Sequence, residues 1–112
     1  MPSNQNPTRK PAAIMFTDIV GYTSLTSRDE LSALHLVNKK NSVLKPLIKK
    51  HHGIPIKDVG DGTLSSFQSA SEASLCAVEF QESVYEDDQM NVRVGIHYGD
   101  TIFKDNDVFG DV

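Results

Sequence analysis

The sequence predicts a small α+β domain, a ferredoxin-like βαββαβ sandwich in which an antiparallel sheet carries its helices on one face. Two segments with helical spacing of apolar residues alternate with short runs of period-two spacing. An Asp-Gly turn joins two of those runs as a hairpin, and further alternating runs follow the second helix. With 112 residues, 38% of them hydrophobic, the chain has the size of one domain with a single core.

The first strand is expected at about residues 12–17, where an apolar run of strand length stands. Residues 1–11 are polar and contain three prolines, so they are expected to form a flexible lead-in to a domain at residues 12–112. After the first strand, Ser27 and Glu30 have the spacing of a capping box and predict the start of a helix.

A long amphipathic helix is predicted after this cap. Its apolar face is expected to contain Leu31, Leu34, Val37, Asn41, Leu44 and Ile48. Pro46 predicts a bend near the last turns, because proline removes a backbone donor and crowds the preceding turn. Gly53 predicts the end of the helix.

The hairpin is expected at residues 54–59 and 63–67, both of which alternate with period two. Ser69 and Glu72 predict the start of a second helix. Its buried face is expected to contain Ala73, Ala77, Phe80 and Val84. The last strands are expected at residues 92–96 and 101–103, and Phe67, Phe80 and Phe103 are expected in the core.

Composition and charge exclude several functions. A net charge of −4 and a pI near 5.4 argue against a nucleic-acid-binding surface, which requires a basic face. No apolar run reaches membrane-spanning length, and the N-terminus lacks the apolar core of a signal peptide, so we expect a cytoplasmic domain without membrane contact. The single cysteine, Cys76, is expected to be a small buried residue in a reducing compartment.

Two acidic residues stand at turns beside the predicted sheet. Asp18 follows the first strand and Asp61 lies in the hairpin turn, so the two carboxylates are expected to converge. The backbone N–H groups of Gly21, Tyr22 and Thr23 are placed to cradle a phosphate as the chain enters a helix. Carboxylates beside an anion loop suit Mg²⁺ or Mn²⁺. The structural alternatives are a helix cap for Asp18 and a turn residue for Asp61.

Four segments of the chain read F-T-D-I-V-G-Y-T at residues 16–23, K-D-V-G-D-G at 57–62, V-G-I-H-Y-G-D at 94–100 and D-V-F-G-D at 107–111. In order and spacing they resemble motifs of the class III nucleotidyl cyclase catalytic domain, of the bacterial type with a short arm. One such motif is weak, but four in order are specific.

This resemblance implies an activity. Members of the family convert a nucleoside triphosphate to a 3′,5′-cyclic monophosphate and pyrophosphate, by attack of the ribose 3′-oxygen on the α-phosphorus, with two Mg²⁺ or Mn²⁺ ions per active site. It implies that Asp18 and Asp61 are the catalytic metal ligands, with the backbone carbonyl of Ile19 as a third. It also implies that the amides of residues 21–23 hold the β- and γ-phosphates.

The resemblance further implies that the substrate is ATP. Lys57 matches the family position that donates a hydrogen bond to the adenine ring nitrogen, and Asp107 the position that accepts one from the exocyclic amine. Guanine presents an N–H where adenine has an acceptor and a carbonyl oxygen where adenine has an amine, so this Lys/Asp pair disfavours guanine. Without the motifs, Lys57 reads as a solvent-facing strand residue and Asp107 as a loop residue.

The resemblance implies a homodimer as well, because family active sites take metal ligands from one subunit and base-reading residues from the other. The family's asparagine and arginine that follow the last motif, and its final helix and strands, lie beyond Val112. We therefore expect the 112 residues to be the N-terminal part of the catalytic domain and to turn over ATP weakly or not at all.

Three alternatives remain. The parent protein is a guanylate cyclase in the first, although Lys57 argues against it. In the second, the domain is a non-catalytic nucleotide-binding or dimerisation module with a regulatory role; the retained Asp18 and Asp61 argue against this. The third is a diguanylate cyclase, whose Gly-Gly-Asp/Glu-Glu-Phe signature the sequence lacks.

Overall fold

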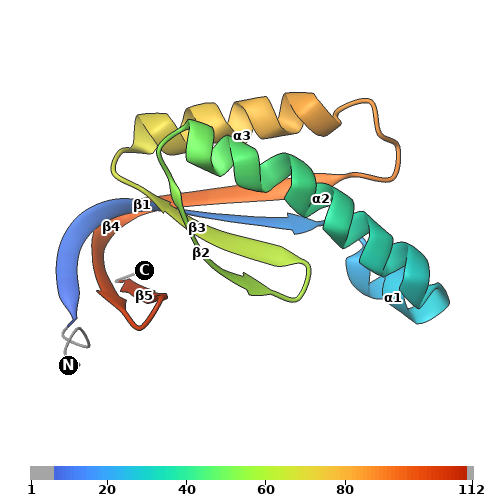
Figure 1. The fold of residues 1–112 in the computed structure, drawn as a ribbon, viewed down its shortest axis with the longest axis horizontal. Coiled ribbons are helices and arrows are strands. Elements are labelled where there is room, and N and C mark those ends of the chain that lie inside the picture. The colour runs from blue at the N-terminus through green and yellow to red at the C-terminus, as the bar shows by residue number, and fades with distance from the viewer. Residues whose placement is uncertain (1–6, 111–112) are drawn as a thin grey trace.

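The computed structural model describes residues 7–110, which form a five-stranded antiparallel sheet with three helices (Figure 1). In chain order the elements are β1 (Thr8–Ile19), α1 (Tyr22–Arg28), α2 (Glu30–Lys50), β2 (Ile54–Val59), β3 (Gly62–Phe67), α3 (Ala70–Val84), β4 (Val92–Lys104) and β5 (Asp107–Gly110). The strand order across the sheet is β2-β3-β1-β4-β5. The predicted antiparallel α+β sandwich is confirmed, with β5 added at the edge beside β4.

The two long helices form the second layer. Figure 1 shows α2 and α3 side by side over one face of the sheet, with α1 at the far end of α2. The core lies between helices and sheet and includes Met15, Leu44, Ile48, Phe67, Cys76 and Phe80. Burial of Phe67, Phe80 and Cys76 is as expected, whereas Phe103 is only half-buried. In the part of the chain described, no helix combines the length and the apolar character needed to cross a membrane.

Strand β1 begins at Thr8, so the expectation of a flexible lead-in through residue 11 was wrong for residues 8–11. The reason is the length of β4, which pairs with β1 from Thr8↔Phe103 onward. Lys10 adds a cation–π contact, with its Nζ 5.0 Å from the centre of the Phe103 ring. Residues 1–6 of the expected lead-in lie outside the described part of the chain.

The expected capping box at Ser27 and Glu30 was also wrong. Ser27 lies inside the short helix α1, where its hydroxyl donates to the Thr23 carbonyl. The N-cap of α2 is instead Asp29, whose carboxylate accepts hydrogen bonds from the backbone N–H of Ser32, at 3.1 Å, and from its hydroxyl, at 2.7 Å. Asp29 is therefore both the C-cap of α1 and the N-cap of α2.

The buried face of α2 differs from prediction in its first half. Leu31 and Leu34 are 79% and 55% exposed, and the face that meets the sheet consists of Ala33, Leu36, Lys40, Leu44 and Ile48. Apolar periodicity placed Asn41 on that face, but the neighbouring lysine occupies the core position. A fully buried lysine is rare in proteins and requires partners.

The remaining elements follow the sequence closely. Strands β2 and β3 form the expected hairpin, in which Gly60 adopts the left-handed conformation at φ +60°. Ser69 caps α3 by accepting a hydrogen bond from the Glu72 backbone N–H. The two expected strands at residues 92–96 and 101–103 are one continuous strand, β4, because β1 pairs with it along its whole length.

Candidate functional site

The C-terminal end of β1 meets the β2–β3 turn at one end of the strands of the sheet. Strands β1 and β3 are antiparallel neighbours with Thr17 opposite Thr63, so the residues after Thr17 lie beside the turn. The carboxylate of Asp61 accepts a hydrogen bond of 2.8 Å from the backbone N–H of Ile19. Of the three expected metal ligands, Asp61 therefore contacts Ile19 directly, and Asp18 is the residue before Ile19 on β1.

Asp18 is paired with an arginine from the other neighbour of β1. Arg93 lies opposite Asp18 in the β1–β4 register, and its guanidinium donates two hydrogen bonds to the carboxylate, at 2.9 and 2.8 Å. The Asp18 side chain is 19% exposed and that of Arg93 is 70% exposed. These hydrogen bonds hold the pKa of the Asp18 carboxyl below its ordinary value, so Asp18 is a carboxylate at neutral pH.

Behind the turn stands the buried lysine of α2. The ammonium of Lys40 donates to the backbone carbonyl of Asp61 at 2.6 Å and to the hydroxyl of Thr63 at 3.0 Å. The same hydroxyl lies 2.8 Å from the carboxylate of Asp58, to which it donates. Burial lowers the pKa of Lys40, and the charges of Asp58 and Asp61 oppose that effect.

The expected phosphate loop follows directly on Ile19. Gly21 has φ +79°, in the left-handed region that favours glycine, and it precedes the first residue of α1. Tyr22 is half-buried and Thr23 is exposed. A cavity of about 400 Å³ adjoins this loop and is lined by Ile19, Gly21 and Tyr22 among others. The loop thus follows closely on two of the candidate metal ligands, Asp18 and Ile19.

The expected base-reading residues also meet. The ammonium of Lys57, on β2, donates to the carboxylate of Asp107, on β5, at 2.9 Å. These strands are the two outer strands of the sheet, so the sheet must curl to bring them into contact. The hydrogen bond from Lys57 holds the pKa of the Asp107 carboxyl below its ordinary value. Both side chains remain partly exposed.

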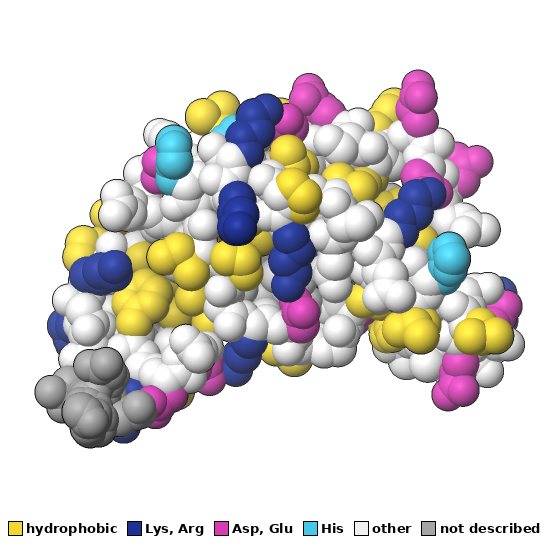
Figure 2. Space-filling model, in the orientation of Figure 1, with side chains coloured by type: hydrophobic (Ala, Val, Ile, Leu, Met, Phe, Trp, Pro, Cys, Tyr) yellow, Lys and Arg dark blue, Asp and Glu magenta, His cyan; other side chains and the backbone are white. Residues whose placement is uncertain are grey.

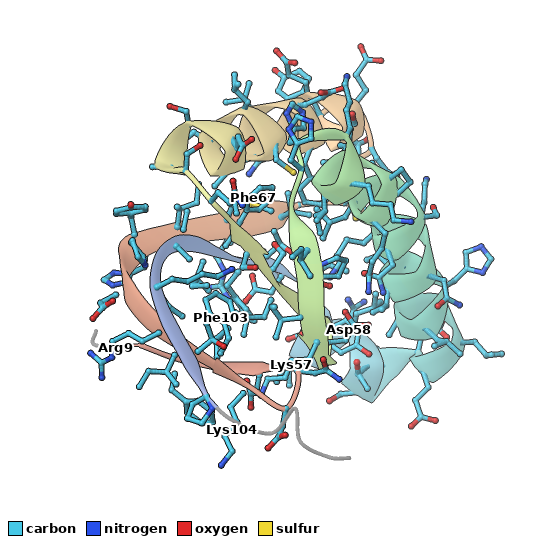
Figure 3. The ribbon with its side chains drawn as sticks, turned by 60° about the vertical axis from the view of Figure 1, so that its left-hand side comes forward. Arg9, Lys57, Asp58, Phe67, Phe103 and Lys104 are labelled. Atoms are coloured by element: carbon cyan, nitrogen blue, oxygen red, sulfur yellow. The ribbon has the colours of Figure 1, made fainter. Side chains whose placement is uncertain are left out.

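A second cavity, of about 330 Å³, lies inside this curl. Its lining includes Ile54, Ile56, Phe103, Lys104 and Asp107. Figure 3 shows Phe103 and Lys104 on the curled end of β4, with Lys57 near the lower end of β2 in that view. The cavity combines an aromatic ring, aliphatic side chains and a carboxylate, which is the mixture that small-molecule sites use.

The donor set at the β1 end suits a hard divalent cation. Within residues 7–110, no group of three or more His, Cys, Asp or Glu side chains could hold a metal ion. Mg²⁺ is commonly bound through one or two carboxylates together with substrate phosphates. Two carboxylates, a backbone carbonyl and an adjoining glycine turn fit that mode, and they do not form a site that is complete without phosphate.

Sequence reasoning missed two charged residues at this site, Arg93 and Lys40. Arg93 stands in a strand of alternating apolar residues, and its pairing with Asp18 depends on the β1–β4 register, which the sequence does not fix. The burial of Lys40 was not predicted, because a charged residue is not expected on the apolar face of a helix. Lys40 lies four residues after Leu36 and four before Leu44, and this spacing was the available signal for its burial.

Comparisons with known proteins agree with this geometry. The sequence profile of the adenylate and guanylate cyclase catalytic domain matches residues 5–107. Putative adenylate cyclase 3 of Rhizobium meliloti (strain 1021) is 40% identical over 111 residues, which are 92% of this chain and 19% of that protein. An adenylate cyclase of Streptomyces coelicolor is 34% identical over 100 residues, 88% of this chain and 26% of that protein. This chain thus spans a fifth to a quarter of the length of these relatives.

A solved structure supports the same assignment. The crystal structure of an adenylate/guanylate cyclase/hydrolase from Silicibacter pomeroyi superimposes with a TM-score of 0.85 at 32% identity, covering 95% of this chain and 66% of that chain. The sequence match, the fold and the order of the four motifs all agree. The chain belongs to the adenylate and guanylate cyclase catalytic domain family.

Proposed function

We propose that this domain is the catalytic domain of an adenylate cyclase, which converts ATP to 3′,5′-cyclic AMP and pyrophosphate in cyclic-nucleotide signalling. The observation that carries the proposal is the 2.8 Å contact between the Asp61 carboxylate and the Ile19 backbone N–H, beside Asp18. The adenylate cyclase names of the two relatives support the choice of ATP.

The metal ligands in this proposal are Asp18, Asp61 and the carbonyl of Ile19. When bound, two Mg²⁺ or Mn²⁺ ions stabilise the attacking 3′-oxygen and the leaving pyrophosphate oxygens. The contact between the Asp61 carboxylate and the backbone of Ile19, the residue after Asp18, supports this ligand set. Asp18 is ionised at neutral pH, and its hydrogen bonds with Arg93 lower its pKa further, so no proton has to leave before a cation enters.

The remaining roles concern the substrate itself. The amides of Gly21, Tyr22 and Thr23 bind the β- and γ-phosphates, since they follow the metal ligands directly. Lys57 and Asp107 read the base, the first as donor to the adenine ring nitrogen and the second as acceptor from its amine. Their 2.9 Å contact supports this, because it holds one donor and one acceptor side by side for the adenine edge.

We further propose a homodimer in which each active site takes metal ligands from one protomer and base-reading residues from the other. Large apolar side chains of the strands remain exposed in the single chain: Phe16, Ile54, Val59, Ile96, Tyr98 and Phe109. Figure 2 shows apolar side chains gathered over the curled ends of β1 and β4. Exposed apolar groups of this kind commonly mark protein interfaces.

Nucleotide titration tests the proposal. With Mn²⁺ present, calorimetry should detect tighter binding of ATP than of GTP, and Asp18→Ala should remove the metal-dependent part of ATP binding. Asp88→Ala is the matched control, because Asp88 is an exposed acid in the loop after α3. Equal or tighter binding of GTP, or metal-dependent ATP binding that survives in Asp18→Ala, would refute the assignment.

A further inference from the structure

Lys40 is a buried cation that the proposed chemistry does not use. Its side chain is 0% exposed and belongs to the face of α2 that packs on the sheet. Both partners of its Nζ lie in the β2–β3 hairpin: the Asp61 carbonyl at 2.6 Å and the Thr63 hydroxyl at 3.0 Å. A carbonyl oxygen only accepts hydrogen bonds, so the lysine is the donor there.

The hydrogen bonds hold Asp61 at two points. Lys40 binds the backbone carbonyl of Asp61 from the α2 side, and the N–H of Ile19 binds its carboxylate from the β1 side. Gly60, the residue before Asp61, has φ +60°, which lets the chain turn sharply there. The orientation of the Asp61 side chain thus depends on both contacts.

The charges around Lys40 are those of the candidate metal site. The carboxylates of Asp58, Asp61 and Asp18 all interact electrostatically with its ammonium. Asp58 has an exposed counter-ion of its own, Lys45 at 3.2 Å. The candidate site therefore combines two carboxylates, Asp18 and Asp61, with two cations. Lys40 binds the backbone carbonyl of Asp61, and Arg93 binds the carboxylate of Asp18.

We propose that Lys40 is a positioning and charge-balancing residue: it fixes the turn at Asp61 and keeps the affinity for a free divalent cation low. The cation is then bound tightly only together with a triphosphate, whose negative charge offsets that of the lysine. A buried charge repels a nearby cation strongly, since salt screens it much less than a surface charge. This role rests on the proposed function, because it takes Asp18 and Asp61 as the metal ligands.

If Lys40 had only a structural role, its removal would change the affinity for a metal ion in the direction opposite to that expected from charge balancing. If Lys40 only braced the hairpin, its removal would loosen Asp61 and weaken the binding of a metal ion. If its charge limits metal binding, its removal strengthens the binding of Mn²⁺ in the absence of nucleotide. The direction of the change in the dissociation constant therefore separates the two roles.

The experiment is a titration of the nucleotide-free chain with Mn²⁺, followed by electron paramagnetic resonance of the free ion. The variants are Lys40→Met, which keeps the apolar stem, and Lys40→Gln, which keeps a donor without the charge. Lys39→Met is the control, because Lys39 is 56% exposed and pairs with Asp87 at the surface. Thermal unfolding establishes that each variant is folded, and Lys40→Gln decides the outcome if Lys40→Met is not.

Both Lys40 variants should bind Mn²⁺ at least about threefold more tightly than the wild type, and Lys39→Met should match the wild type. Unchanged or weaker binding in the folded Lys40 variants would overturn the charge-balancing role. The variant Asp61→Asn shows whether a negative result concerns only the role of Lys40 or the proposed metal site as a whole. If it loses Mn²⁺ binding while the Lys40 variants do not tighten it, only the role of Lys40 is wrong; if it binds like the wild type, the proposed metal site itself is wrong.

Discussion

The guanidinium of Arg93 donates two hydrogen bonds to the carboxylate of Asp18, at 2.9 and 2.8 Å, across the β1–β4 register. Bidentate pairs of this kind fix the orientation of a carboxylate as well as its charge. The carboxylate concerned is a candidate metal ligand, so the pair fixes the position of a proposed metal ligand at the end of β1.

Acid should weaken the Asp18–Arg93 pair and with it the fold. The pKa of Asp18 lies below its ordinary value in the folded chain, chiefly through the hydrogen bonds from Arg93. A group of this kind stabilises the fold above its unfolded-state pKa and loses that contribution as the pH falls through its folded-state pKa. Arg93→Gln should therefore lose less unfolding free energy than the wild type between about pH 5 and pH 2, as measured by urea denaturation.

The control for this prediction is Arg9→Gln, which breaks the exposed pair of Arg9 and Asp100. Exposed pairs contribute little, so this variant should follow the wild-type pH profile. A decline in Arg93→Gln as steep as that of the wild type would show that the pair does not stabilise the fold.

Base selectivity should depend on Lys57. Replacing it with alanine removes the donor to the adenine ring nitrogen, and the preference for ATP over GTP in Mn²⁺-dependent binding should fall about tenfold or more. Lys45→Ala removes a similar charge from α2 near the same hairpin, where Lys45 pairs with Asp58, and should keep the wild-type preference. An undiminished preference in Lys57→Ala would exclude it as a base reader.

Shared active sites should be visible in mixtures of variants. Asp18→Ala lacks a metal ligand and Lys57→Ala lacks a base reader, so neither alone should show selective, Mn²⁺-dependent ATP binding. A mixed dimer contains one site with both residues intact, and mixing should restore part of the binding measured by calorimetry. Mixtures that bind no better than the separate variants would argue against the composite site.

The thiol of Cys76 should be inert in the folded chain. Burial raises its pKa to about 11, and the side chain belongs to the core beneath α3. Labelling with a thiol reagent at neutral pH should be slow in buffer and fast in concentrated urea, with the exposed-thiol rate as the reference. Rapid labelling in buffer would contradict the packing of α3 on the sheet.

Much of the fold could be predicted because local patterns and packing agree there. The β2–β3 hairpin has an Asp-Gly turn between alternating strands, and Ser69 has a glutamate at capping distance. The start of β1 could not be predicted in this way. Thr8 to Pro11 are polar and contain proline, and they are ordered by pairing with β4, a partner more than eighty residues away.

In the candidate site too, the residues in local motifs could be predicted, and those that depend on distant partners could not. Asp18, Asp61, Lys57 and Asp107 stand at turns or in recognisable motifs. Lys57 contacts Asp107, and Asp61 contacts the backbone of Ile19, next to Asp18. Lys40 escaped because a charge at a core position contradicts the apolar pattern, and its partners come from another part of the chain. The sequence-based expectation of weak turnover by these 112 residues stays a prediction.

The most direct test of the metal site counts the Mn²⁺ ions bound in the presence of ATP, by electron paramagnetic resonance of the wild type and Asp61→Asn. The wild type should bind two ions per active site in total, counted after the Mn²⁺ held by ATP free in solution has been subtracted. Asp61→Asn should weaken this binding at least about tenfold, since even the loss of groups that only support a metal ligand typically has that effect. Equal binding by the two proteins would contradict the assignment of Asp61, and with it the proposed two-metal chemistry.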